Sequence, residues 1–168
     1  FMPFFEGTGY ARVYSGLTGA VLGTYVGDVV TDNYGRSVDG AGDVNNDGWD
    51  DIVVGAPFSS YNLTQMRGMV RVISGQTGAT LFTVHGAASG DQLGAAVSKA
   101  GDVNGDGHDD FIGGAPDADS NKGMARVYSG ADGSVLYQFD GSGSNDRLGA
   151  SVSDLGDVNG DGKDDFII

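Results

Sequence analysis

The feature that most constrains this chain is a nine-residue segment that occurs three times with almost the same residues. The copies are Asp43–Asp51 (DVNNDGWDD), Asp102–Asp110 (DVNGDGHDD) and Asp157–Asp165 (DVNGDGKDD). Each copy has oxygen-bearing side chains at positions 1, 3, 5 and 9, and glycine at position 6. A hard cation such as Ca²⁺ collects carboxylate, amide and backbone oxygens around one tight turn of this kind. The spacing therefore predicts three calcium loops within a repeated fold.

The position within each loop predicts which residues bind the ion. We expect ligands from the side chains at positions 1, 3, 5 and 9 and from the backbone carbonyl at position 7, with about three Ca²⁺ per chain. The glycine at position 6 permits the sharp turn, because glycine readily adopts a positive φ. The predicted ligands are Asp43, Asn45, Asp47, Trp49 and Asp51; Asp102, Asn104, Asp106, His108 and Asp110; and Asp157, Asn159, Asp161, Lys163 and Asp165.

Other kinds of acidic loop fit the repeated segment less well. An EF-hand needs Glu at position 12 and flanking helices, whereas position 12 is Val54, Gly113 or Ile168 within a predicted strand. A dockerin-type loop fails at the same position. An acidic turn without metal is the remaining alternative, although clustered carboxylates repel one another unless a cation joins them. The acids at position 8 are expected to support the ligands or contact solvent; they are Asp50, Asp109 and Asp164.

The charge of the chain excludes several classes of partner. Acidic residues outnumber basic ones 23 to 9, which gives a formal charge of -14. Twelve of the acids lie in the three loops, so three divalent ions would bring the charge to about -8, counting two charges per ion. Without a basic patch, the chain is not expected to bind nucleic acid. No apolar run approaches the length of a membrane span, so membrane insertion is not expected either.

The spacing of the loops gives the length of the repeat. The glycine before each loop and a strand-like Ser-Gly segment both recur after 59 and then 55 residues. The repeat is therefore about 56 residues long, and three repeats account for the chain. The recurring elements are Gly42, Gly101 and Gly156, and the segments 11–16 (ARVYSG), 70–75 (VRVISG) and 125–130 (ARVYSG).

Each repeat contains four short apolar runs, which predict four strands. The runs have about 4 to 7 residues, are rich in Val, Ile, Phe and Tyr, and are separated by Gly, Asp, Asn or Ser. No window predicts an amphipathic helix of 10 or more residues. Four strands per repeat of this length are typical of a propeller blade. In the second blade, for example, the runs are 94–97, 111–112, 125–128 and 134–139.

Two further motifs identify a family resemblance. A Tyr/Leu-Gly-x-x-Val segment precedes each loop, at Tyr34, Leu93 and Leu148, and Gly-Ala-Pro follows two of them, at 55–57 and 114–116. The chain resembles the FG-GAP repeats of integrin alpha-chain propellers and their bacterial relatives. The resemblance implies an all-β fold of four-stranded blades around a central axis. It also implies calcium in the hairpin loop between the first two strands, with ligands usually bound on the opposite face.

The third repeat departs from this pattern, because residue 168 stands where Gly-Ala-Pro would follow. Residues 2–16 supply the missing half of the motif instead. We therefore expect one half-propeller domain over 1–168, with full blades at about 34–86 and 93–141 and a split blade made of 1–27 and 148–168. Because closed propellers typically have 4 to 8 blades, we expect two chains to form a six-bladed homodimer. A fragment of a longer propeller is the rival interpretation.

The sequence favours a binding function over catalysis. The chain has two histidines. We expect His85 at the end of a strand and expect the side chain of His108 to have no role, because position 7 contributes its backbone carbonyl. No Gly-x-Ser-x-Gly elbow of a hydrolase is present. We expect a non-catalytic, calcium-binding scaffold for extracellular or cell-surface adhesion to proteins or glycans. The alternative is a module of a secreted hydrolase or lyase. The loops expected to contact a partner are 4–8, 58–67 (with Tyr61 and Met66), 117–122, 28–33, 87–92 and 142–147.

Overall fold

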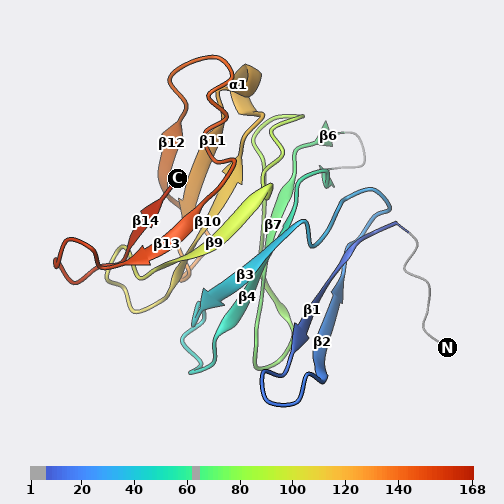
Figure 1. Ribbon diagram of the computed structural model, residues 1–168, viewed down its shortest axis with the longest axis vertical. Helices are drawn as coiled ribbons and strands as arrows, with labels where there is room; N and C mark the ends of the chain where they lie inside the picture. Colours follow the sequence, from blue (N-terminus) through green and yellow to red (C-terminus); the bar gives the residue numbers. More distant parts are fainter. Residues whose placement is uncertain (1–6, 62–64) are drawn as a thin grey trace.

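A computed structural model describes residues 7–61 and 65–168 of the chain and shows an all-β fold (Figure 1). All the strand pairs in its five sheets are antiparallel. Two sheets have four strands and three have two. The predicted fold class is therefore confirmed. Among the described residues, no helix is long and apolar enough to cross a membrane.

Each four-stranded sheet has the strand order of a propeller blade. The first sheet contains β3 (Ser37–Gly42), β4 (Asp51–Ala56), β7 (Met69–Ile73) and β8 (Thr80–His85), in that order. The second contains β9 (Ala96–Gly101), β10 (Asp110–Ala115), β11 (Met124–Tyr128) and β12 (Val135–Asp140). Neighbouring strands follow one another in sequence, so tight turns and loops suffice to connect them. We call these two sheets the first and second blade.

Two half-blades lie on opposite sides of the molecule (Figure 1). One consists of β1 (Tyr10–Tyr14) and β2 (Val21–Val26), and the other of β13 (Ser153–Gly156) and β14 (Asp165–Ile167). By their place in the repeat, β1 and β2 match the two outer strands of a blade, and β13 and β14 match the two inner ones. The two pairs do not form one sheet within the chain. The number of blades in the working protein stays a prediction.

The first strand of each repeat begins later than the sequence suggested. The runs at 35–38, 94–97 and 149–152 start with a glycine that has a positive φ of 84°, 87° or 83°. A Cβ on any of these glycines would lie 2.2–2.4 Å from a backbone oxygen of the neighbouring sheet. The Tyr/Leu-Gly pair is thus a close contact between blades, and parallel bridges join Gly9 to Tyr34, Gly68 to Leu93 and Gly123 to Leu148. These strand boundaries were wrong, because the glycine packs against the backbone of the neighbouring sheet and lies before the first paired residue of its own strand.

Two loops contain short regular elements that periodicity does not predict. The loop after the first blade's second strand forms a small hairpin of β5 (Ser60–Tyr61) and β6 (Gln65–Met66), and its tip at 62–64 lies outside the described residues. The matching loop of the second blade contains the four-residue element α1 (Ala118–Asn121), a tight turn in which Asp119 and Ser120 have left-handed backbone angles. The expected contact loop at 4–8 is described only from residue 7 onward.

Aromatic rings connect the two blades in the core. Phe111 is fully buried and stacks on Tyr128 of its own blade, with ring centroids 5.2 Å apart. On its other side lies Phe82 from β8 of the first blade, at 6.2 Å. The first strands β3, β9 and β13 also lie next to one another. Packing of this kind fixes the blades relative to one another and brings the three repeated loops into sequence along one edge of the molecule.

Candidate metal-binding loops

The three repeated loops connect the first and second strand of each repeat, as the resemblance implied. Positions 1 to 8 form the loops between β3 and β4, between β9 and β10, and between β13 and β14. Position 9 is the first residue of the following strand, which is Asp51, Asp110 or Asp165. The carboxylate at position 9 is therefore held by the sheet, whereas the other predicted ligands lie on the turn.

The first aspartate of each loop accepts the same hydrogen bonds in all three copies. In the first loop, the Asp43 carboxylate accepts the backbone N–H of Asp47 at 2.9 Å and that of Gly48 at 2.8 Å. The equivalent pairs measure 3.0 and 2.9 Å at Asp102, and 3.1 and 2.9 Å at Asp157. The backbone thus curls around this carboxylate. Glycine at position 6 makes the turn possible, with φ of 85–88° in the three loops.

The other side chains of the loops repeat in the same way. The asparagine oxygen at position 3 accepts the N–H of position 5, and the position-5 carboxylate accepts the N–H of position 7, at 2.8–3.0 Å. The position-9 carboxylate accepts the N–H of the valine at position 2, at 3.0–3.1 Å. Each predicted side-chain ligand is therefore hydrogen-bonded to the backbone of its own loop.

The position-9 carboxylates differ in how deeply they are buried. Asp110 is fully buried and also accepts the N–H of Gly130 at 2.9 Å. Burial raises the pKa of Asp110 to about 6, although the hydrogen bonds from Gly130 and Val103 lower it. Burial also raises the pKa of Asp51, which accepts the N–H of Gly75. A negative charge at these two sites is costly without a nearby cation.

The chemistry of the donor set fits a hard cation. Each loop offers three carboxylates and one amide oxygen, and none of the nine predicted aspartate ligands forms an ion pair with a basic side chain among the described residues. Oxygen ligands of this kind suit Ca²⁺. In residues 7–61 and 65–168, however, no three acidic, histidine or cysteine side chains converge on one point. The carboxylates are bound instead to the backbone N–H groups described above.

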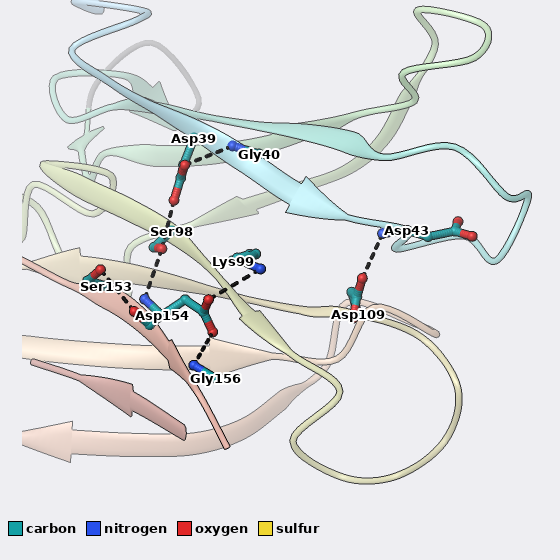
Figure 2. Close-up of polar contacts among 9 residues, drawn as sticks. All are labelled: Asp39, Gly40, Asp43, Ser98, Lys99, Asp109, Ser153, Asp154 and Gly156. Atoms are coloured by element: carbon teal, nitrogen blue, oxygen red, sulfur yellow. Dashed lines mark hydrogen bonds and ion pairs between the residues drawn. The ribbon is translucent and has the colours of Figure 1, made fainter. Parts of the chain in front are cut away.

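The second and third loops each contact the loop before them, which the sequence did not predict. The Asp109 carboxylate at position 8 accepts the backbone N–H of Asp43 in the preceding loop at 2.8 Å (Figure 2). The ring of His108 at position 7 lies 2.8 Å from the carbonyl oxygen of Val44. Lys163, at the same position of the third loop, donates to the carbonyl of Val103 at 3.2 Å. The His108 ring is therefore not incidental, and positions 7 and 8 join successive loops.

Glycine before the first and second loops leaves room for the acid of the following repeat. A Cβ at Gly42 would lie 2.1 Å from the Asp109 carboxylate, and one at Gly101 would lie 1.9 Å from that of Asp164. A larger residue at either glycine would therefore clash with the position-8 acid of the following repeat. Trp49, which occupies position 7 of the first loop, is 60% exposed.

A second polar network crosses the first strands of the three repeats (Figure 2). Ser98 of β9 donates to the Asp39 carboxylate of β3 at 2.7 Å and accepts the backbone N–H of Asp154 in β13 at 3.3 Å. Lys99 forms an ion pair with Asp154 at 3.2 Å. The sequence signal for this network is a polar residue three or four positions before each loop. It holds the blades together at their inner strands.

Comparison with known proteins agrees with this architecture. The FG-GAP repeat family matches residues 34–73 and 93–136, which together make up half of the chain. The chain is 32% identical to mouse integrin alpha-3 and 33% identical to Drosophila melanogaster integrin alpha-PS2, over 73% and 76% of its length. It is 34% identical to Caenorhabditis elegans integrin alpha pat-2 over 84% of its length. The alignments span 10–14% of these relatives. The chain belongs to the FG-GAP repeat family.

Proposed function

We propose that this chain is a calcium-stabilised, non-catalytic propeller module that binds partners in adhesion outside the cell. The observation that carries the calcium part is the threefold hydrogen-bond pattern of the loops. The same aspartate, asparagine and glycine positions adopt the same turn three times, and none of these carboxylates has an ion pair with a basic side chain in the part of the chain that the structure describes. Bound Ca²⁺ would offset this charge and tie each loop to the start of the following strand.

Calcium binding is tested on protein stripped of metal with EGTA and then titrated with CaCl2 in a calorimeter. We expect about three ions per chain and a rise in the melting temperature, because a ligand that binds only the folded state stabilises it. One site at 100 times its Kd contributes about 2.7 kcal/mol. Mg²⁺ is the matched control ion, since its octahedral preference suits these flexible loops less well. No binding heat and an unchanged melting curve would contradict the proposal.

The adhesion part of the proposal is supported by the relatives. All three are integrin alpha chains by name, and members of this kind suggest a cell-surface or extracellular setting and a protein or glycan partner. The loops between blades and those after each second strand lie together, away from the metal loops. Backbone hydrogen bonds join them, for example from Leu93 to Arg67 and from Leu148 to Lys122. Within these loops Met66 is 56% exposed and available for contact.

The alternative interpretation, a module of a secreted hydrolase or lyase, has no observation among the described residues in its favour. The His108 ring is engaged with a loop carbonyl. His85 ends the strand β8, and burial lowers its pKa. We therefore keep the non-catalytic proposal.

Self-association is the second part of the proposal. Among the described residues, β1 pairs only with β2 and β14 only with β13. The free edges of β1 and β14 are the ones that a complete blade would pair with each other. Unpaired edges readily accept strands from other chains, and exposed Tyr10 and Ile167 accompany these edges. A second copy would supply the complementary pair, as would further repeats in one longer chain. Light scattering on the chain is expected to give about twice 17.1 kDa. A mass of 17.1 kDa at all concentrations would reject association.

A further inference from the structure

The third strand of each repeat contains an arginine whose surroundings differ between repeats. The residues are Arg12, Arg71 and Arg126, at the same 59- and 55-residue spacing as the loops. The side chain of Arg71 in the first blade is only 13% exposed and forms an ion pair with Asp28. Asp28 comes from the loop that follows β2, so this ion pair joins the half-blade to the first blade. Both guanidinium Nη atoms contact the carboxylate.

The next interface contains the same arginine but lacks the aspartate. One repeat after Asp28 the residue is Ala87, and the glycine before each confirms the alignment. Gly27 donates its N–H to Gly9 at 3.2 Å, and Gly86 donates to Gly68 at 3.1 Å. Among the described residues, no carboxylate lies within ion-pair distance of Arg126. Its Nε donates to the side-chain oxygen of Gln138 at 2.9 Å.

A cavity of about 360 Å³ lies at this position between the two blades. Its lining includes Ala87 and Arg126, the two residues that correspond to the Asp28–Arg71 pair, together with Ala88, Met124, Lys122 and Asp140. Its volume lies in the range of sites for small molecules. We call it the interblade cavity. It belongs to the loops away from the metal-binding loops.

The interblade cavity also contains negative charge, which limits what it can bind. Asp140 stands where the first blade has His85, and its carboxylate accepts the Gln138 amide at 3.0 and 3.1 Å. Gln138 therefore bridges Arg126 and Asp140. Among the described residues, Arg126 and Asp140 are thus joined through a neutral amide and form no ion pair, whereas the other charged side chains of the lining have partners of their own. Lys122 pairs with Asp119 at 2.7 Å, and the buried Asp91 accepts the N–H of Ala88 at 2.7 Å.

We propose that the interblade cavity binds a small zwitterion, whose carboxylate contacts Arg126 in place of the missing aspartate and whose ammonium group contacts Asp140. A simple anion would meet Asp140, and a simple cation would meet Arg126, so neither is complementary to both charges. The terminal amide of Gln138 now bridges the two charged groups, so the ligand has to displace this side chain. An ω-amino acid with a short methylene chain carries the two required opposite charges at its ends. This inference goes beyond the proposed function and does not depend on calcium.

The probe for this site is γ-aminobutyrate, with butyrate and n-butylammonium as matched single-charge probes. We expect γ-aminobutyrate to bind wild-type protein with a Kd on the order of 1 mM, measured by chemical-shift changes of the backbone amides at residues 87–91 and 122–126. The other two probes are expected to bind at least about tenfold more weakly. Equal binding of butyrate, or no response to γ-aminobutyrate at roughly 20 mM, would overturn the proposal.

Two variants test the residues. Ala87→Asp supplies the carboxylate found in the other interface and is expected to abolish binding without lowering the melting temperature. Ser142→Asp adds the same charge at the equivalent position of the following repeat, outside the cavity, and is expected to leave binding unchanged. Arg126→Gln is expected to weaken γ-aminobutyrate binding about tenfold, and it provides a second test if Ala87→Asp does not fold. Unchanged binding in folded Arg126→Gln protein would refute the assigned carboxylate contact.

Discussion

Replacing Phe111 with alanine is expected to lower the free energy of unfolding by about 3–5 kcal/mol. The ring is fully buried and stacks between Phe82 of the first blade and Tyr128 of the second. Its removal leaves a cavity at the contact between the blades, and both neighbouring rings lose their partner. Urea denaturation followed by circular dichroism measures the loss.

Phe139→Ala is the control for this prediction. Phe139 lies on β12, is 37% exposed and contacts the rings of Phe166 at 5.7 Å and Tyr137 at 6.4 Å. Removing it is expected to cost about 1 kcal/mol, because much of its surface already contacts water. If both substitutions lowered stability equally, the aromatic contact between blades would not be the principal packing site that we infer.

Replacing Asp110 with alanine is expected to destabilise the metal-free protein by about 2 kcal/mol. The carboxylate accepts the N–H groups of Val103 and Gly130 in a fully buried site, and both donors lose their acceptor. Removing the buried negative charge of Asp110 is itself favourable and offsets part of this loss. If the calcium proposal is right, the variant also binds one ion fewer per chain in a calorimetric titration.

Asp165→Ala is the matched control, since Asp165 has position 9 in the third loop. It accepts the N–H of Val158 in an exposed setting, where water can replace the lost acceptor. The expected loss of stability without metal is therefore below about 0.5 kcal/mol, whereas the loss of one calcium site is the same. An equal effect of the two substitutions in metal-free protein would show that burial of Asp110 is not the cause.

The sequence predicts the local features of this fold well. A turn such as that of Asp43–Asp51 depends on residues within nine positions of one another, and the apolar runs that follow need only their own alternation to form strands. The threefold copy adds the repeat length. These patterns involve residues close together in the sequence, so they can be recognised without knowing the fold.

Contacts between repeats are the part that sequence could not predict. The Asp109 carboxylate accepts the backbone N–H of Asp43, which lies 66 residues away. Because almost every residue has a backbone N–H, the sequence does not indicate which one an acid will bind. Asp28 and Arg71 lie 43 residues apart, a spacing that matches no period of the repeat. The change from Asp28 to Ala87 is visible by aligning the repeats, but its meaning depends on knowing which arginine it contacts. The late start of β3 after Gly35 has the same origin.

The contacts at loop positions 7 and 8 are directional, since the side chain always comes from the later repeat and the backbone groups from the earlier one. At the contact between the first two loops, the later repeat supplies the Asp109 carboxylate and the His108 ring, and the earlier repeat offers only a glycine, a backbone N–H and a carbonyl. Every non-proline residue has a backbone N–H and a carbonyl, so the side chain at position 7 can be His108 or Lys163 without a matching change in the preceding repeat. A gene encoding such a protein could therefore gain or lose whole repeats while each new junction forms at once. Growth in number of blades would need no coordinated second substitution.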